Sequence, residues 1–489
     1  MYVTKKDFQM KKYLWILLLS CSMPLLTSCE EFIDLLDIVF DNPASTYTPT
    51  YDNDANIPDE IYVADVNQPN AKEYLPAPPT TSDVAFLDDE IQWEWGKTQR
   101  STDRGKIAMA HMGRSSQTMC KVMAEIMGLA TISKDATPAI YRLLRRAYNT
   151  GERSTLTVKS KYNRQRPFAQ MGEAAWYADD ANDNTGSYTS ATTAAGWAVG
   201  LAFAEMWPPL QNKFLRKAFQ FGEDRVISGS NFQSDVEGGY CCGAAAMAQA
   251  HLDKKLQEDI AAAREEYKKL LGVASSYDPT AGIGIPEGVK ILNAPLNTSD
   301  SRYQADLMRY YEAKKLRDTN RGQQAVMDAD TSTDNIAKIF GGIIGITISP
   351  STTPAIYRLM ELIRPNNATI CQDVKLTYFR LRPFAQLGES TPLPAKEPYY
   401  KTQSSYPSGH TCYSWAVALM LAEVAPAYQN QILARAYVFG DNRVIVGYHW
   451  PTDIDAGRIL AASLIANMHS SEEFRNLIKQ GQAEYKNLK

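Results

Sequence analysis

Apolar residues recur along this chain at the spacing of an α-helix. Trp415, Leu419 and Ala422 would share one helical face, and residues 454–469 and 472–488 show the same period of three to four residues. Sustained alternation of apolar and polar residues is scarce, and no Asn-Gly turn joins two β-branched runs. The pattern therefore predicts an all-α protein made of helical bundles.

The chain also contains one long pattern twice. Residues 137–143 recur unchanged at residues 353–359, and other matched segments are offset by 216 to 218 residues. A repeat of this length indicates duplicated domains, in contrast to a solenoid of short units. We predict two tandem bundles, which we call the first repeat (residues 74–271) and the second repeat (residues 289–489).

The N-terminus has the features of a bacterial export signal. Residues 1–28 begin with several lysines, continue with an apolar stretch and end in small residues before Cys29. This ending resembles a lipoprotein cleavage site, so we expect a lipid on Cys29 and an extended tether over residues 29–73. The alternative is an ordinary cleaved signal followed by an incidental cysteine. We expect an exported protein that is anchored in the bacterial envelope and faces the periplasm or the cell surface.

Size and charge narrow the class of protein. The 489 residues exceed one ordinary core, which agrees with two domains. A formal net charge of −4, without a basic run, argues against nucleic acid as the partner. Five cysteines remain beyond Cys29, and this odd number predicts no disulfide framework.

Three separated motifs in the second repeat concentrate cations. Lys375 is followed after six residues by Arg382, and Arg443 lies near the C-terminus. Guanidinium groups suit phosphate oxygens, which they can bind in a bidentate way. Ser408 and Gly409 precede a predicted helix, where exposed backbone N–H groups favour an anion. Together these residues predict an oxyanion site.

Two histidines add reactive groups to this site. His449 lies four residues before Asp453, so on a helical turn both would share a face. A carboxylate beside Nδ1 would fix the tautomer and make Nε2 a better nucleophile. His410 can then protonate a departing alkoxide. No cluster of carboxylates or Cys/His ligands predicts a metal, so we expect the cations to stabilise the charge.

These motifs resemble those of the type 2 phosphatidic acid phosphatase superfamily, which also contains the vanadium haloperoxidases. Residues 405–411 and 443–450 look most like the bacterial class A non-specific acid phosphatases, and the resemblance covers both repeats. It implies an all-α acid phosphatase or haloperoxidase fold and hydrolysis of small phosphomonoesters without a metal. Asn442 departs from the family, which usually has Ser there; an Asn could still donate to phosphate.

The resemblance also implies a role for each residue. His449 would become phosphohistidine, Asp453 would orient it, and His410 would be the general acid. The phosphate would be bound by Lys375, Arg382, Ser408, Gly409 and Arg443.

The first repeat keeps the cations but lacks both histidines. Thr192 and Asn231 stand where the second repeat has His410 and His449, so we predict a catalytically inactive copy. The retained residues are Lys159, Arg166, Ser190, Arg225 and Asp235. They would either pair internally and hold the fold or form an anion pocket that binds without cleaving.

Two other functions stay open at this stage. A vanadium-dependent haloperoxidase would hold vanadate in the same pocket, where an acid phosphatase would be inhibited by it. A lipid-anchored phosphate-binding or scaffold protein would fit the first repeat and leave the complete second repeat unexplained. The two repeats would pack as a homodimer fused into one chain.

Overall fold

The computed structural model describes residues 61–113, 115–183 and 185–489. The predicted signal peptide, Cys29 and most of the tether lie outside the described residues. Those that are described form α-helices and short 3₁₀ turns, with no strand among them. The prediction of an all-α protein is therefore confirmed.

Within the described ranges, eleven α-helices and three 3₁₀ turns lie in the first repeat or directly ahead of it. They are α3 (Ala71–Tyr74), α4 (Val84–Gln99), α5 (Asp103–Ala110), α6 (Ser116–Met127), α7 (Pro138–Arg153), α8 (Leu156–Tyr162), α9 (Pro167–Gln170), α10 (Ala191–Met206), α11 (Gln211–Ser228), α12 (Gln233–Ala250) and α13 (Lys254–Leu271), with α3 just ahead of the predicted boundary. The turns η1 (Asp65–Asn67), η2 (Ala178–Asn182) and η3 (Pro208–Leu210) lie between or before them.

The second repeat follows the same order. Its helices are α14 (Gly288–Ile291), α15 (Tyr303–Lys314), α16 (Asn320–Met327), α17 (Thr333–Ile344), α18 (Pro354–Thr377), α19 (Pro383–Leu387), α20 (Glu397–Tyr400), α21 (Gly409–Val424), α22 (Gln429–Ile445), α23 (Pro451–His469) and α24 (Glu472–Asn487). The turns η4 (Pro394–Lys396) and η5 (Pro426–Tyr428) complete it. One long helix, α18, takes the place of α7 and α8. The proposed end of the first repeat, residue 271, is the last residue of α13, and the proposed start of the second, residue 289, lies one residue inside α14.

One nearly all-apolar helix lies at the centre of each repeat. Every residue of α10 from Thr193 to Met206 is buried, and so is every residue of α21 from Thr411 to Val424. A helix that is apolar on all sides must be surrounded by other elements. Accordingly, α10 packs against α7, α11 and α12, and α21 packs against α18, α22 and α23.

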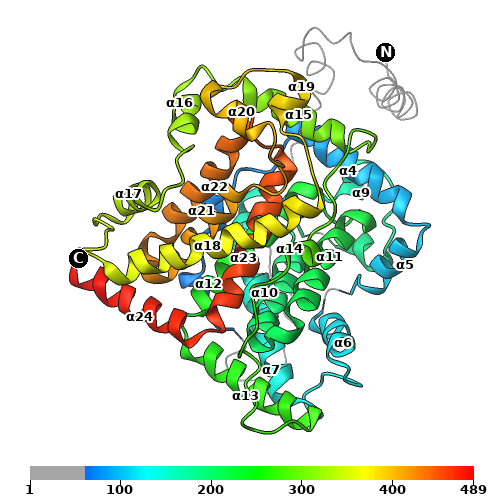
Figure 1. Ribbon diagram of the computed structural model, residues 1–489. Coiled ribbons are helices and arrows are strands. Elements are labelled where there is room, and N and C mark those ends of the chain that lie inside the picture. Colours follow the sequence, from blue (N-terminus) through cyan, green and yellow to red (C-terminus); the bar gives the residue numbers. More distant parts are fainter. Residues whose placement is uncertain (1–60, 114, 184) are drawn as a thin grey trace.

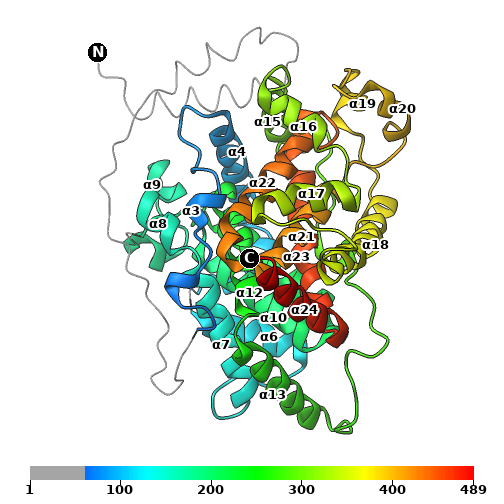
Figure 2. The same ribbon diagram turned by 90° about the vertical axis from the view of Figure 1, so that its left-hand side faces the viewer.

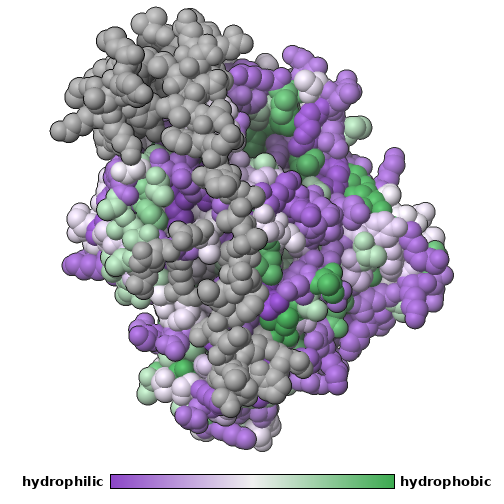
Figure 3. Space-filling view, turned by 180° about the vertical axis from the view of Figure 1, so that it is seen from behind, coloured by the Kyte–Doolittle hydropathy of each residue, from purple (hydrophilic) through white to green (hydrophobic). Residues whose placement is uncertain are grey.

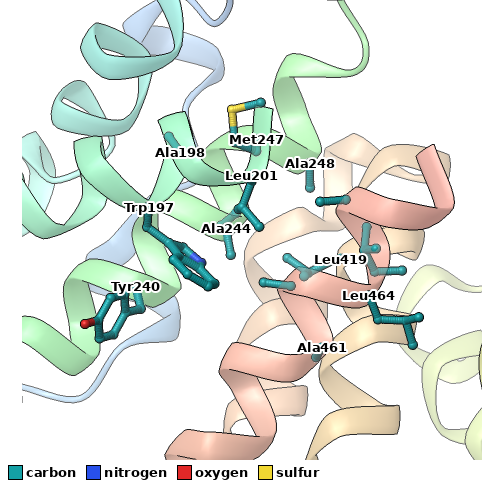
Figure 4. Close-up of a cluster of buried hydrophobic side chains, with 14 of the residues drawn as sticks. Trp197, Ala198, Leu201, Tyr240, Ala244, Met247, Ala248, Leu419, Ala461 and Leu464 are labelled. Atoms are coloured by element: carbon teal, nitrogen blue, oxygen red, sulfur yellow. The ribbon is translucent and has the colours of Figure 1, made fainter. Parts of the chain in front are cut away.

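The two repeats share one continuous hydrophobic core. Helix α10 packs on α23 while α12 packs on α21, and α3 reaches α22 while α14 reaches α11, so the contacts between repeats are reciprocal. Figure 4 shows Leu201 and Ala248 of the first repeat beside Leu419 of the second. Burial of apolar surface at about 25 cal/mol per Å² therefore stabilises the junction as well as each bundle.

The outer surface is mixed in polarity. On the face shown in Figure 3, hydrophobic residues form separate small patches between hydrophilic ones. Within the described ranges, none of the helices has the length and apolar character needed to cross a membrane.

Candidate active site

The residues of the predicted site gather at one end of the second repeat. Figures 1 and 2 both place α19 and α20 together at this end, next to α15 and α16. The site takes side chains from the end of α18 (Lys375), the residue before α19 (Arg382), the start of α21 (Ser408, Gly409, His410), α22 (Arg443), the turn before α23 (His449) and α23 itself (Asp453).

Lys375 and Arg382 are held by the loop that precedes α21. Lys375 donates from Nζ to the carbonyl oxygens of Ser404 (2.9 Å) and Pro407 (2.7 Å). Arg382 donates to the carbonyl of Tyr448 at 2.8 Å, and its Nη1 lies 3.1 Å from Nε2 of His449. Arg382 also donates from Nη2 to the Ser404 carbonyl at 3.2 Å, so both cations are bound to this loop, and Arg382 touches the predicted nucleophile.

Arg443 brings a further cation whose donors are only partly used. The side chain is fully buried and donates from Nη2 to the carbonyl of Ala325. Its Nε and Nη1, like Nε of Arg382, have no hydrogen-bond partner among the described residues. Buried guanidinium donors without acceptors are costly. An anion in the pocket would supply the missing acceptors.

The start of α21 is open toward the site. Ser408 caps the helix, accepting from the backbone N–H of Thr411 at 3.3 Å. A Cβ on Gly409 would meet open space, whereas a Cβ on Gly457 would come within 2.8 Å of the Ser408 carbonyl. Gly457 thus lets α23 approach the start of α21, and Gly409 leaves the backbone there accessible to a ligand.

His449 does not lie on a helical turn with Asp453, as the sequence analysis expected. Helix α23 begins at Pro451, and Trp450 before it is extended (ψ 155°), because a residue that precedes proline disfavours the helical region. His449 therefore stands on the turn ahead of the helix. Its Nδ1 still lies 3.4 Å from Oδ2 of Asp453, although without the alignment of a hydrogen bond.

His410, at the start of α21, lies near His449. Its ring centre lies 6.5 Å from that of His449, and its Nε2 is 3.3 Å from the carbonyl of Ala329. The side chain is half-buried, in contrast to the buried His449. A group bound to His449 could therefore present its leaving atom to His410.

Burial and positive neighbours set the protonation of the site. Burial, followed by the charges of Arg382 and Lys375, holds the pKa of His449 well below its usual value. Burial, Arg443 and His449 lower the pKa of His410 in the same direction. Burial and then Arg382 lower the pKa of Lys375 to about 7. Burial and the neighbouring cations thus favour the neutral form of both imidazoles in the free site.

Asn442 points away from the pocket. Its Nδ2 donates to Asp328 at 2.6 Å, and its Oδ1 accepts from Arg321. The expectation that this residue could donate to phosphate is therefore not met, because its amide is engaged on both sides.

Sequence reasoning missed two residues that build the site. Arg380 donates to Oδ1 of Asp453 at 2.7 Å and also pairs with Asp306 at 2.5 Å. The ring of Tyr400 lies 4.5 Å from the guanidinium of Arg382. A comparison of the repeats could have revealed Arg380, since Arg164 occupies its place in the first repeat.

The matched residues of the first repeat are also close together, but they contact each other and the backbone. Lys159 donates to the carbonyl of Gly186, and Arg225 to those of His111 and Met112. Arg166 forms an ion pair with Asp183. The cations of this repeat therefore have protein partners, as expected if they hold the fold.

Asn231 occupies the place of the missing histidine in that repeat. Its Nδ2 donates to the carbonyl of Ser187 at 2.8 Å, and its Oδ1 accepts from Ser190 at 3.2 Å. Asp235 pairs with Arg164 at 2.7 Å, as Asp453 does with Arg380. No proton-transfer group replaces the two histidines at these positions.

Known proteins match parts of this chain. The family model described as PAP2 superfamily matches residues 357–476. A non-specific acid phosphatase of Providencia stuartii is 35% identical over 204 residues, 42% of this chain and 82% of that protein. A non-specific acid phosphatase of Salmonella typhimurium is 34% identical over 194 residues, 40% of this chain and 78% of that protein.

An acid phosphatase of Zymomonas mobilis is 33% identical over 186 residues, which cover 37% of this chain and 69% of that protein. Each alignment is about as long as one repeat. The matches agree with the helical fold and with the arrangement of cations and histidines around one pocket. The chain thus belongs to the PAP2 superfamily and, within it, to the family of the non-specific acid phosphatases.

Proposed function

We propose that the second repeat is a metal-independent acid phosphatase that hydrolyses small phosphomonoesters through a phosphohistidine at His449. The observation that carries the proposal is the set of buried guanidinium donors without acceptors beside His449, whose pKa burial and the neighbouring cations hold well below its usual value. Lys375, Arg382 and Arg443 would neutralise the phosphate and its transition state, a task for which other phosphatases use a metal ion.

In the first step, Nε2 of His449 attacks phosphorus and the bond from phosphorus to the leaving oxygen breaks. His410 gives its proton to that oxygen. The negative charge of the bound phosphate opposes the effect of Arg443 on His410, so substrate binding raises the pKa of this acid. Asp453, 3.4 Å from Nδ1, would stabilise the positive charge that His449 gains.

In the second step, water attacks the phosphorus of the phosphohistidine. His410, now neutral, takes a proton from this water, and the nitrogen–phosphorus bond breaks. Phosphate leaves, His449 is neutral again and His410 carries a proton for the next cycle. The open start of α21 with Ser408 and Gly409 would hold the phosphate oxygens throughout.

The test is hydrolysis of p-nitrophenyl phosphate in the presence of EDTA. We expect activity at acidic pH that EDTA leaves unchanged and that His449→Ala abolishes. Asn231→Ala, the matched change in the first repeat, should leave the activity as it is. A trapped, acid-labile phosphoprotein should form in the wild type and be absent from His449→Ala.

Loss of activity in EDTA would contradict metal independence. Inactivity of a folded wild type, together with bromide oxidation by peroxide after vanadate is added, would favour the haloperoxidase. In the proposed phosphatase, vanadate would act as an inhibitor in the same pocket.

We propose further that the first repeat is inactive and that the two repeats pack as a fused homodimer. Reciprocal packing of α10 on α23 and of α12 on α21 supports this arrangement, because a two-fold interface pairs the same surfaces in both directions. Export and a lipid on Cys29 are likewise proposals, supported by the N-terminal sequence alone. Labelling with a radioactive fatty acid, lost in Cys29→Ala, would test the anchor.

A further inference from the structure

Two matched pairs of ionisable residues meet where the repeats join. Glu205 on α10 and His251 after α12 belong to the first repeat, and Glu423 on α21 and His469 at the end of α23 belong to the second. Within each kind the two residues are 218 positions apart, which is the repeat offset. All four side chains are at most 7% exposed.

The first pair is fixed in one orientation. Nδ1 of His251 lies 2.8 Å from the carbonyl of Met247, so this nitrogen carries the hydrogen. Nε2 then points at Oε2 of Glu205, also at 2.8 Å, and Gln257 donates to the other carboxylate oxygen. A neutral imidazole in this tautomer would turn a lone pair toward a carboxylate. A proton or a metal ion must therefore lie between them.

The second pair leaves polar atoms without partners. Nε2 of His469 lies 2.9 Å from Oε1 of Glu423. Oε2 of Glu423 and Nδ1 of His469 are buried and have no hydrogen-bond partner among the described residues. A buried carboxylate oxygen without a partner is costly, so this oxygen would gain from a proton or a cation.

The four groups form one cluster. The imidazole rings of His251 and His469 are stacked, with centres 3.5 Å apart and planes 14° from parallel. One ligand atom from each of Glu205, His251 and His469 can be chosen so that the three lie within 4.8 Å of one another. A cavity of about 10 Å³, lined by Glu205, His251 and Leu419 among others, adjoins them. Two carboxylates and two neutral imidazoles would carry a charge of −2, which one divalent cation cancels.

We propose that Glu205, His251 and His469, with Glu423 as fourth ligand, bind one zinc-like divalent metal ion between the two repeats. Two imidazoles and two carboxylates form a donor set that suits Zn²⁺, and a site closed by four protein ligands is typical of structural zinc. The bond from His251 to the Met247 carbonyl is the kind of outer contact that orients a metal-binding imidazole. The lone pairs of two nearly parallel rings do not converge on one point, so at least one imidazole must rotate for both to reach the ion.

Such an ion would have a structural role. Its ligands come in equal number from the two repeats, so it would join them at their shared core, whereas the phosphate site lies at the far end of α21, whose first residue is Gly409. Removing the ion should therefore lower thermal stability without changing the chemistry at His449. The proposal is independent of the proposed phosphatase activity.

The experiment titrates untagged, chelator-treated protein with Co²⁺ and then displaces it with Zn²⁺. We expect one equivalent of Co²⁺ per chain, visible as d–d absorption, and a rise in Tm with Zn²⁺. His251→Gln and His469→Gln should each abolish the absorption and the rise. His111→Gln, which alters another buried histidine that pairs with a carboxylate, should keep both.

Glu423→Gln guards against variants that fail to fold. It preserves the shape of the side chain and removes a ligand charge, so it should bind Co²⁺ more weakly while its helical circular dichroism stays unchanged. No Co²⁺ or Zn²⁺ binding by the wild type would overturn the proposal and leave a cluster that shares protons only. Binding that persists in both histidine variants would overturn it as well.

Discussion

Two matched arginines, Arg166 in the first repeat and Arg382 in the second, have different partners. In the first, Arg166 forms an ion pair with Asp183 and donates to the carbonyl of Ser230. In the second, Arg382 faces the ring of Tyr400 and Nε2 of His449. A carboxylate satisfies the cation permanently, whereas an aromatic face and a neutral imidazole leave its charge available to an anion. The difference teaches that retained cations do not by themselves make a binding site.

Other parts of the site are alike in both repeats. Arg164 joins Asp89 to Asp235 in the first repeat, and Arg380 joins Asp306 to Asp453 in the second. Because the copy that lacks both histidines keeps this buried network, we infer that the network holds the start of α12 or α23 in place. The two copies differ at the histidines and in the partners of the matched arginines Arg166 and Arg382.

The largest effect on catalysis should follow from removing Arg382, whose charge is available to an anion. Arg382→Ala should lower kcat/KM by about 10²- to 10³-fold, because one donor to the transition state is lost. The measurement is hydrolysis of p-nitrophenyl phosphate under steady-state conditions.

Arg166→Ala is the matched control for that change. It should leave kcat/KM unchanged and lower the free energy of unfolding by about 3–5 kcal/mol, since a buried carboxylate on Asp183 loses its partner. Equal losses of activity in the two variants would mean that the first repeat also takes part in catalysis.

A smaller effect should appear in the pH profile. Because the pKa of Lys375 is lowered to about 7, its positive charge is present below this pH and is lost above it. We therefore expect kcat/KM to fall by up to about tenfold per pH unit above neutrality. Lys375→Arg should move this fall to higher pH, since a guanidinium keeps its charge.

The wild type and Lys375→Arg are compared on the same substrate, so the ionisation of the substrate affects both pH profiles equally. Lys159→Arg, at the matched position of the first repeat, should leave the profile unchanged. If the fall of kcat/KM at high pH occurs at the same pH in Lys375→Arg, a group other than Lys375 causes it.

The sequence was sufficient to predict what depends on local spacing. The helical period over residues 454–469 matches α23, and the three motifs supply the cations and histidines that meet in the pocket. The prediction that His449 shares a helical turn with Asp453 was wrong. Pro451 starts the helix and pushes Trp450 into an extended conformation, so that the histidine falls ahead of it.

Contacts between distant helices could not be predicted in the same way. Arg380 and Asp306 are 74 residues apart, and although Arg380 lies between Lys375 and Arg382, nothing in that motif points to Asp306 as its partner. Glu205 and His251 are 46 residues apart, and so are Glu423 and His469. Each pair lies within one repeat, and the two pairs meet only because the two repeats pack together. The offset of 218 residues between these pairs can be seen in the sequence. That the two pairs contact each other cannot, because it depends on which surfaces of the repeats pack together.

The smallest expected effect concerns the matched cations of the first repeat. It would show whether Asp183 alone prevents an anion from binding to them. Asp183→Asn removes the charge that pairs with Arg166 and leaves room of about the same size. In an Arg443→Ala background, which disables the second site, phosphate should then raise the Tm by mass action. Asp103→Asn, which makes the same charge change on a side chain 93% exposed, should show no such rise. If phosphate leaves the Tm of the Asp183→Asn protein unchanged, the carboxylate is not what excludes anions. Arg166 and Arg225 would then serve only the fold, held by the backbone carbonyls of Ser230, His111 and Met112.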